Sequence, residues 1–204
     1  MYHISCFIPD SNLYSSRPLR GGADKNAHMT RPFSDNIIFV DTEFSTLDPY
    51  KGEILSVGLV KPDGTELYLE LEHEGEVSDW VKENIRHMLT QPKVSRAEAR
   101  KRIRDFVGPG KPYMVTFVTQ FDSIYLYKLF ETDNPREDAF PFHKWPIDFA
   151  AILFANGRDP EHILDAKSAL MKELGIDATR YRDHHALDDA KLLREAWMKF
   201  FQKK

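Results

Sequence analysis

The sequence predicts an α/β domain with a mixed sheet of five to six strands flanked by helices. Three strand patterns come first: the apolar run 37–40 leading into residues 41–44, then residues 53–60, then residues 65–71. A strong turn signal, Pro62-Asp63-Gly64, separates the last two. Because helical and strand patterns alternate from there on, the antiparallel part of the sheet is expected to come first.

Periodicity and capping predict the remaining elements. A capping box, Ser95 with Glu98, opens one helix, and Gly175 closes another. The polar segment 131–146 is predicted to be a long loop. Helices are expected at residues 78–89, 95–107, 121–130, 165–174 and 186–201, a strand at residues 113–119, and a short strand running into a helix over residues 147–154.

Composition suits one ordinary globular domain, since the 204 residues are 42% hydrophobic and 29% charged. No apolar run approaches the roughly 18 residues of a membrane-spanning helix, so no membrane partner is expected. The single cysteine, Cys6, excludes an internal disulfide and fits a reducing, cytoplasmic setting. A net charge of −4 disfavours strong non-specific binding to nucleic acid, unless clustered acids hold cations that reverse the local charge.

Residues 1–28 differ from the rest of the chain. They show no helical or strand periodicity, are rich in Ser, Asn, Gly and Pro, and lack the basic start and apolar stretch of a secretory signal. We interpret them as an added leader ahead of a natural start at Met29, with a natural disordered tail as the alternative. The prediction is therefore a single folded domain over residues 29–204.

Two acids follow the first predicted strand. Asp41 and Glu43 are two positions apart in an extended segment, so their side chains project from the same face. Two neighbouring carboxylates at the end of a buried strand repel each other unless a cation binds them or a proton is shared. Carboxylate oxygens are ligands that Mg²⁺ and Mn²⁺ prefer. The pair indicates a metal site; two acids that only cap the strand in solvent are the alternative.

A third acid lies inside an apolar stripe of the last predicted helix. Asp189 shares the helix face of Ala186 and Leu193, whereas Asp188 points towards the polar face. A carboxylate on the core side of a helix needs a partner. Either a buried salt bridge or a cation would supply it. Asp122 opens a helix after a strand, and taken alone it is best explained as an N-cap.

Three short motifs stand in a particular order along the chain: DTEF at residues 41–44, FVTQFD ending at Asp122, and HHALDDA at residues 184–190. From Asn36 to Phe201 the chain resembles the DEDD exonuclease superfamily, which has a ribonuclease H-like fold. The DTEF start, the Trp-containing helix after the first three strands and the FVTQFD motif are most similar to a branch of small bacterial and phage 3′→5′ exoribonucleases.

The resemblance implies a role for each matched residue. Asp41, Glu43, Asp122 and Asp189 would hold two Mg²⁺ or Mn²⁺ ions. His184 precedes Asp189 by five residues, as in the His-type (DEDDh) subclass, and would be the general base that activates water.

Some positions leave alternatives or depart from the superfamily pattern. His185 occupies the slot of the tyrosine in the Tyr-type subclass, so it is the second candidate for the base, or else a neighbouring surface imidazole. The chain also departs from the pattern at 118–120 and 45–47, which tend to handle the terminal nucleotide.

The resemblance also implies an activity and partners. The expected reaction is two-metal-ion hydrolysis of RNA from its 3′ end, on single strands or 3′ overhangs, which releases nucleoside 5′-monophosphates. A DNA-directed trimming or proofreading exonuclease is the alternative, because only contacts to the 2′-OH distinguish the two. A non-catalytic nucleic-acid-binding module would have lost acids that this chain retains. A homodimer is a further expectation at the level of the family.

Phe44 and Leu47 flank the first motif and are candidates for binding the terminal base of the substrate. For Phe44, packing in the core explains the residue equally well.

Three weaker patterns complete the sequence predictions. The stripe Arg96, Arg100 and Arg104 fits a solvated helix face better than a track for phosphates. Asp148 is expected to cap a helix. The aromatic and basic loop that contains Phe140, Phe142, His143 and Trp145 could line a strand channel or form a dimer contact.

Overall fold

The computed structural model describes residues 32–131, 140–160 and 168–202. The predicted leader, residues 1–28, lies outside the described residues. In the described part, one six-stranded sheet has the order β4-β3-β2-β1-β5-β6. Its strands are β1 (Ile37–Phe44), β2 (Ile54–Val60), β3 (Glu66–Leu71), β4 (Lys93–Val94), β5 (Tyr113–Thr116) and β6 (Ile147–Asp148). The helices are α1 (Asp79–Asn84), α2 (Arg96–Val107), α3 (Thr119–Phe130), α4 (Phe149–Ala155), α5 (Ala169–Leu174) and α6 (Ala186–Gln202), with 3₁₀ turns η1 (Arg86–Met88) and η2 (Ala178–Arg180).

The sheet is mixed, as the sequence predicts. β1 pairs antiparallel with β2, and β2 antiparallel with β3, which forms the expected antiparallel first part. On the other side of β1, β5 is parallel to β1 and β6 is parallel to β5. β1 therefore lies in the interior of the sheet, and residues 37–40 are buried because both faces of the strand are covered.

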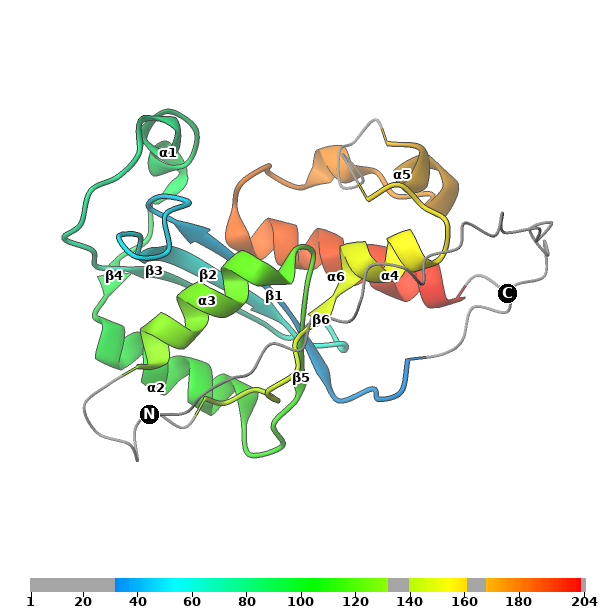
Figure 1. The fold of residues 1–204 in the computed structure, drawn as a ribbon, viewed down its shortest axis with the longest axis horizontal. Coiled ribbons are helices and arrows are strands. Elements are labelled where there is room, and N and C mark those ends of the chain that lie inside the picture. Colours follow the sequence, from blue (N-terminus) through cyan, green and yellow to red (C-terminus); the bar gives the residue numbers. More distant parts are fainter. Residues whose placement is uncertain (1–31, 132–139, 161–167, 203–204) are drawn as a thin grey trace, which may run out of the picture.

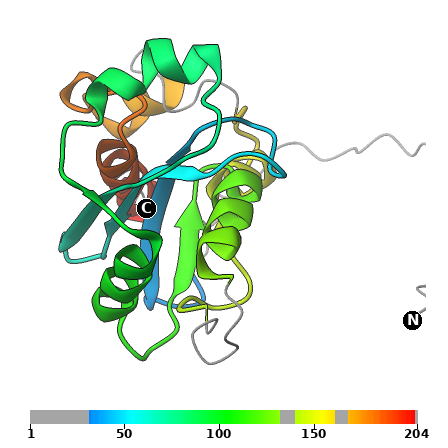
Figure 2. The ribbon, with the colours of Figure 1, turned by 90° about the vertical axis from the view of Figure 1, so that its left-hand side faces the viewer.

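Helices cover both faces of the sheet (Figures 1 and 2). One apolar core lies between the sheet and helices α2 and α3, and it includes Val40, Ile103 and Leu126. A second core lies between the sheet and helices α4, α5 and α6, and it includes Phe39 and Trp197. The predicted apolar stripe of α6 is thus confirmed as the face that packs on the sheet. In the described residues no helix is long and apolar enough to cross a bilayer.

Several boundaries differ from the prediction. The helix expected over residues 78–89 is α1 followed by the tighter turn η1, and Pro92 prevents its continuation. The strand expected to reach residue 119 ends at Thr116, because α3 begins at Thr119, whose N–H donates to the Asp148 carboxylate at 3.0 Å. α5 begins four residues later than expected, after the N-cap Ser168. The short edge strand β4 was not predicted, since two residues carry no periodic signal.

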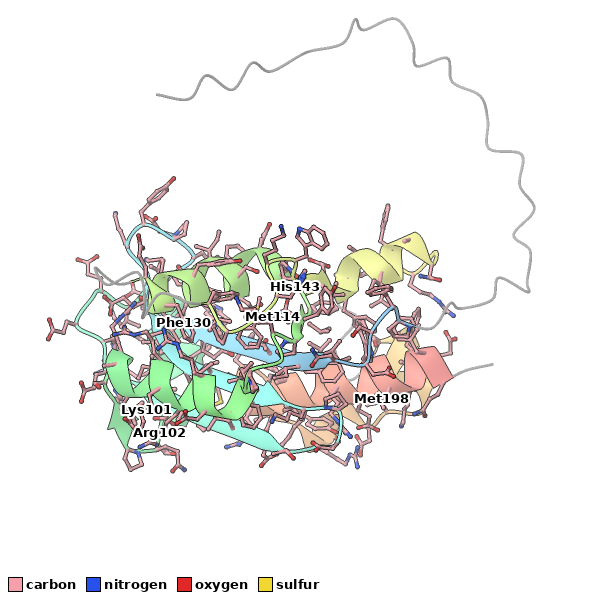
Figure 3. All side chains as sticks on the ribbon, turned by 90° about the horizontal axis from the view of Figure 1, so that it is seen from below. Lys101, Arg102, Met114, Phe130, His143 and Met198 are labelled. Carbon is pink, nitrogen blue, oxygen red and sulfur yellow. The ribbon has the colours of Figure 1, made fainter. Side chains whose placement is uncertain are left out.

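The arginine stripe of α2 faces α3, so the predicted solvated face is wrong. Arg96 and Arg100 donate to the backbone carbonyls of Lys128 and Leu129, at 3.1 and 3.2 Å. These carbonyls belong to the last turn of α3, where they have no partner inside the helix, and a guanidinium also suits the negative end of the helix dipole. The solvent side of α2 instead carries Lys101 and Arg102 (Figure 3).

The aromatic loop packs largely on the protein itself. Phe142 is buried, and Phe140 stacks on Tyr127 of α3 at 4.1 Å between ring centroids. His143 lies on Tyr113, while Trp145 remains 62% exposed. These four rings are not among the side chains that line the acidic hollow described below.

Candidate active site

A close contact between α6 and β2 brings the acidic residues together. Gly58 of β2 pairs with Asp41 of β1, and the first turn of α6 lies directly above it. A β-carbon on Gly58 would lie 2.3 Å from the carbonyl oxygen of Ala186 and 2.5 Å from the Cα of Leu187. Only glycine allows this approach, which places Asp189 beside the acids of β1.

Three carboxylates meet at this contact. Asp41 and Glu43 project from one face of β1, and Asp189 projects from the first turn of α6. Each can present an oxygen such that all three atoms lie within 4.8 Å of one another. Glu43 is only 8% exposed, so the alternative of acids that merely cap a strand in solvent is wrong. In the described part of the chain no salt bridge is formed by these acids, which leaves them without a protein cation.

Asp122 lies on the same hollow but outside this group of three. Its Oδ1 accepts hydrogen bonds from the backbone N–H of Thr42, at 2.9 Å, and from the Thr42 hydroxyl, at 2.7 Å. The N-cap of α3 is Val118, so the interpretation of Asp122 as an N-cap is wrong. Thr42 faces away from Asp41 and Glu43 along the strand, and its bonds tie α3 to β1 next to both acids.

The acids lie in an open hollow of about 210 Å³. Its wall is aromatic on one side, where Phe44 stacks on Tyr125 with ring centroids 4.5 Å apart. Leu47, by contrast, is 64% exposed and is not among the lining residues. The hollow is lined by Asp41, Thr42, Glu43, Phe44, Phe117, Val118, Phe121, Asp122, His184 and Asp189.

The two histidines have different environments. His184 is exposed, lines the acidic hollow, and has a left-handed backbone with φ 58°. His185 is buried: its ring stacks on Tyr68 at 4.6 Å, and its Nδ1 lies 3.3 Å from the Arg182 guanidinium. The interpretation of His185 as a surface imidazole is therefore wrong. Of the two, His184 is the one that the fold brings to the acids.

Burial raises the pKa of every acid in the hollow, and neighbouring negative charges raise it further. For Asp41 the causes are burial first and then the charges of Asp122, Asp189 and Glu43. Burial, followed by the charges of Asp189 and Asp122, raises the pKa of Glu43 to about 8. Burial raises the pKa of Asp122 to about 7, although the Thr42 hydrogen bonds act in the opposite direction. Four acids with raised pKa values in one hollow are typical of a functional site rather than a structural one.

Burial also raises the pKa of Asp189 to about 7, with further increases from the charges of Asp183 and Asp188. Hydrogen bonds from the backbone N–H groups of His184 and His185 partly offset the rise. Asp189 therefore also holds the turn that carries His184.

The donor set fits a hard divalent cation. Two oxygens on opposite sides of a Mg²⁺ ion lie about 4.2 Å apart, so a group within 4.8 Å needs only a small movement to bind one. Three carboxylates with no neutral or sulfur donors are the ligands of Mg²⁺ and Mn²⁺ rather than of Zn²⁺ or Cu²⁺. A bound cation would also offset the repulsion that, after burial, raises the pKa of Asp41 and of Glu43.

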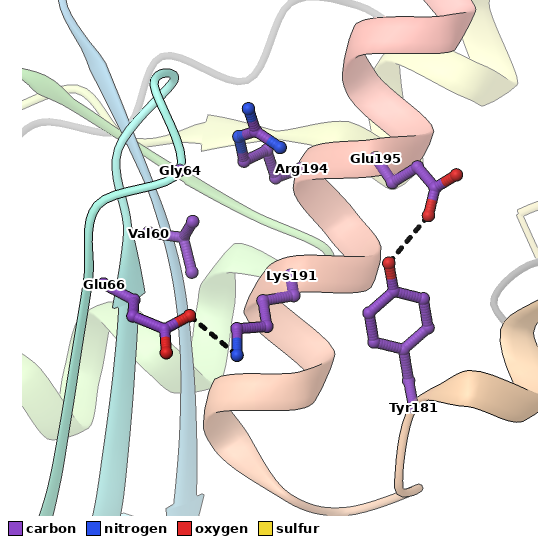
Figure 4. A pocket seen from close by; sticks show the side chains of 7 residues that line it. All are labelled: Val60, Gly64, Glu66, Tyr181, Lys191, Arg194 and Glu195. Carbon is purple, nitrogen blue, oxygen red and sulfur yellow. Dashed lines mark hydrogen bonds and ion pairs between the residues drawn. The ribbon is translucent and has the colours of Figure 1, made fainter.

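Several charged side chains near the hollow are paired within the protein. Asp188, predicted to point elsewhere, accepts from the Arg182 guanidinium at 2.6 Å. A second hollow of about 260 Å³ lies between the β2–β3 hairpin and α6 (Figure 4). There Lys191 pairs with Glu66 at 2.7 Å, and the Tyr181 hydroxyl donates to Glu195 at 2.7 Å. This second hollow therefore offers no charge that lacks a partner.

Comparisons with known proteins support the fold. No protein-family model and no curated protein sequence matches the chain. Among solved structures, the Exonuclease I of Methylocaldum szegediense matches with a TM-score of 0.55 and 16% identity over 82% of this chain. The E. coli Exonuclease I in complex with a dT13 oligonucleotide matches with a TM-score of 0.57 and 14% identity, also over 82% of this chain.

The fold is ribonuclease H-like. The six-stranded mixed sheet with its antiparallel first part and its flanking helices is similar to that of Exonuclease I. The chain spans only 40% and 41% of the length of these two enzymes. On this ribonuclease H-like fold, Asp41, Glu43 and Asp189 form a cluster of carboxylates that could hold a metal ion.

Sequence reasoning missed residues that shape the site. Gly58 stands alone in an apolar strand, and such a glycine is a signal of close backbone approach that could have been used. Thr42 and the aromatic residues Phe117 and Phe121 gave no such signal, because their roles depend on which strand and helix lie opposite each other.

The raised pKa values predict how the stability of the metal-free protein depends on pH. The folded protein holds protons on these acids at pH values where the unfolded chain, with carboxyl pKa values of about 4, has lost them. The stability that these acids contribute should therefore be fully present below about pH 4, and it should be lost as pH rises through about 7 to 8, where Asp189 and Glu43 ionise. Thermal unfolding in EDTA, followed by circular dichroism between pH 5 and 8.5, would measure this loss.

A matched variant separates this effect from other titrations. Burial lowers the pKa of His185, which makes an oppositely signed contribution near neutral pH. Glu43→Gln keeps His185 and removes one acid, so its melting temperature should fall less between pH 5 and 8.5 than that of the wild type. Equal slopes for the two proteins would contradict the prediction.

Proposed function

We propose that this domain is a divalent-metal-dependent 3′→5′ exonuclease that acts on single-stranded DNA. One observation carries the proposal: the carboxylates of Asp41, Glu43 and Asp189 meet within 4.8 Å, in a hollow that also contains Asp122 and His184. An uncompensated acidic cluster is costly to keep without cations. The ribonuclease H-like fold and its two exonuclease neighbours favour phosphodiester hydrolysis as the chemistry of such a cluster.

Each side chain has a proposed part in the reaction. Bound cations would lower the pKa of the attacking water and stabilise charge on the phosphate oxygens. The acids hold these cations, and Asp122 is kept in place by Thr42. His184, at the exposed side of the hollow, accepts the proton of the water. Phe44 and Phe121 form an apolar wall against which the terminal base can stack. Leu47 lies outside the hollow, so it would contact the nucleic acid only where the bound DNA strand extends beyond the hollow.

DNA is the preferred substrate in this proposal. The sequence resemblance favoured RNA, but the comparisons give RNA no support and agree better with the DNA-directed alternative. The E. coli Exonuclease I was solved with a DNA oligonucleotide, dT13. A single strand suits the open hollow, because a stacking wall accepts unpaired bases of any sequence.

A labelled-oligonucleotide time course tests the proposal. With 5′-labelled single-stranded DNA and Mg²⁺ or Mn²⁺, we expect a ladder that shortens one nucleotide at a time from the 3′ end. EDTA should abolish it, and RNA of the same sequence should be trimmed more slowly. Internal cleavage, or no cleavage with either metal, would refute the exonuclease proposal, while faster trimming of RNA would reverse the substrate preference.

Asp122→Asn is the matched variant for this assay. Asparagine keeps an oxygen that can accept from Thr42, so the fold should persist while one charge is lost. Removing groups that only orient metal ligands costs about 10- to 100-fold in activity, and we expect a loss at the upper end of that range or beyond. Unchanged activity in Asp122→Asn would show that Asp122 has no part in the site. If the wild type binds the DNA but does not cleave it, the result would favour a non-catalytic nucleic-acid-binding module.

A further inference from the structure

The α1 segment forms an arm at one end of the molecule (Figure 1), apart from the two main cores. Val81 and Ile85 bury their side chains with Leu55 in a small cluster of their own. The backbone of the arm is pinned at both ends. Ser78 donates its N–H to the Ser45 carbonyl at 2.9 Å, and the N–H groups of Thr90 and Gln91 donate to Oε1 of the buried Glu70, at 2.9 and 3.0 Å. The arm is therefore held in a definite place despite its small core.

Trp80 is the large side chain that this arm leaves outside its cluster. It is 51% exposed, whereas the next residue, Val81, is buried. The indole meets the imidazole of His184 edge to face, with ring centroids 4.9 Å apart and an interplanar angle of 88°. The contact joins α1 to the turn before α6, which are far apart in the sequence. An edge-to-face aromatic pair has a preferred geometry, so the half-exposed Trp80 makes a specific contact and is not simply an apolar side chain left in solvent.

His184 is weakly held apart from this contact. Its backbone is left-handed, with φ 58°, which is uncommon for a residue with a β-carbon. Among the described residues its imidazole forms no hydrogen bond or salt bridge, and only its backbone N–H is held, by the Asp189 carboxylate. A general base normally needs a third group that orients its ring. In this site no described carboxylate or carbonyl bonds the imidazole, and the Trp80 ring is its aromatic neighbour.

We propose that Trp80 is a positioning residue for His184, and that the edge-to-face contact between the two rings holds the imidazole towards the acidic hollow. The inference rests on the proposed function, because it assigns an orienting partner to the proposed base. Trp80 itself is not among the residues that line the hollow. Its effect should therefore be on the proton transfer and not on the affinity for the substrate.

Kinetics of Trp80 variants test the inference. We expect Trp80→Ala to lower kcat about 3- to 10-fold, the orienting effect that one edge-to-face aromatic pair can supply, and to change KM less than twofold. Trp80→Phe should recover most of the loss, because phenylalanine can also make an edge-to-face contact with the imidazole. Trp145→Ala is the control, since it removes a 62% exposed tryptophan that does not line the hollow, and it should leave both constants unchanged.

A double-mutant cycle distinguishes positioning from contact with the substrate. In a His184→Ala background, Trp80→Ala should cause no further loss of the residual activity. The same loss in both backgrounds, or a rise in KM at constant kcat, would overturn the inference, because Trp80 would then act on the nucleic acid. If the wild type trims DNA, His184→Ala is inactive and Trp80→Ala is fully active, the inference fails while the proposed function stands.

A spectroscopic measurement does not depend on activity. The ring current of an indole 4.9 Å away should shift the His184 Cε1–H or Cδ2–H signal in the NMR spectrum of the metal-free protein. We expect Trp80→Ala to move that signal towards the value of a free histidine and Trp145→Ala to leave it in place. An unmoved His184 signal in a folded Trp80→Ala variant would show that the rings do not touch in solution, and would overturn the inference even if no nuclease activity is found.

Discussion

Asp41→Asn should abolish metal-dependent hydrolysis and, at the same time, make the metal-free protein more stable. Asp41 feels the charges of all the other acids in the hollow: burial, and then the charges of Asp122, Asp189 and Glu43, raise its pKa. Asparagine has nearly the same shape, so the main change is the loss of one negative charge from a repulsive cluster. The rate should fall by more than the 10- to 100-fold that is typical of the groups that orient metal ligands.

The gain in stability follows from the same repulsion. One favourable kcal/mol shifts the melting temperature of a domain of this size by about 2–4 °C, and we expect at least that gain for Asp41→Asn in EDTA at pH 8. At pH 5 the gain should be smaller, because the wild-type acids are then largely protonated. In saturating Mg²⁺ the wild type should have the higher melting temperature, since it gains free energy from metal binding that the Asp41→Asn variant lacks.

Asp63→Asn is the control for this experiment. Asp63 lies in the turn between β2 and β3, where a hydrogen bond from the Thr65 backbone lowers its pKa, the opposite of Asp41. The same chemical change there should leave activity intact and give no increase in melting temperature. A metal-free Asp41→Asn protein that melts below the wild type at pH 8 would mean that the acids are not in mutual repulsion.

Gly58→Ala should damage both the fold and the activity, although it adds a single methyl group. The new β-carbon would lie 2.3 Å from the Ala186 carbonyl oxygen and 2.5 Å from the Leu187 Cα, and backbone atoms cannot move aside as a flexible side chain can. The start of α6 must therefore move away from β2. Overpacking of this kind costs about 1–3 kcal/mol or more, which corresponds to several degrees in melting temperature.

The loss of activity should be larger than the loss of stability suggests. The first turn of α6 carries Asp189, and the turn before it carries His184, so a shift of α6 moves both away from Asp41. A displacement of about 1 Å in a catalytic site can cost on the order of 100-fold in rate. Steady-state kinetics well below the melting temperature of the variant would separate misplacement from unfolding.

Gly110→Ala is the matched control, because a β-carbon there would meet only ordinary contacts with Asn36, at 3.6 and 3.8 Å. It should leave activity unchanged and the melting temperature within about 2 °C, as expected for a surface substitution. If Gly58→Ala behaves like Gly110→Ala, then α6 does not pack on β2 as closely as described.

Local periodicity explains which parts of the site could be predicted. The two-residue repeat of a strand was enough to place Asp41 and Glu43 on one face, and the structure confirms that they meet. The apolar stripe of the last helix was enough to predict that the Asp189 side chain points towards the sheet and that of Asp188 points away from it. For the same reason the mixed sheet with an antiparallel first part was predictable, although the two-residue strand β4 was not.

Properties that depend on a partner far along the chain could not be predicted in this way. The arginines of α2 were expected in solvent, because the spacing of residues along one helix does not indicate which helix packs against it. In the structure, Arg96 and Arg100 donate hydrogen bonds to the last carbonyls of α3. Taken alone, the local sequence predicted Asp122 to be a helix N-cap, whereas in the structure it accepts two hydrogen bonds from Thr42 of β1 and the N-cap is Val118.

The sequence by itself determined the donor chemistry: which carboxylates face inwards, and the order of strands and helices that presents them. Tertiary structure decided the rest. It decided which of the two adjacent histidines lies at the hollow, because the turn before α6 exposes the His184 ring there and buries the His185 ring on Tyr68. It also set the distance between α6 and the sheet, because Gly58 of β2, next to β1, has no side chain and allows α6 to approach closely. The physical reason is that spacing along a strand or helix fixes direction, whereas distances between elements come only from how their surfaces pack.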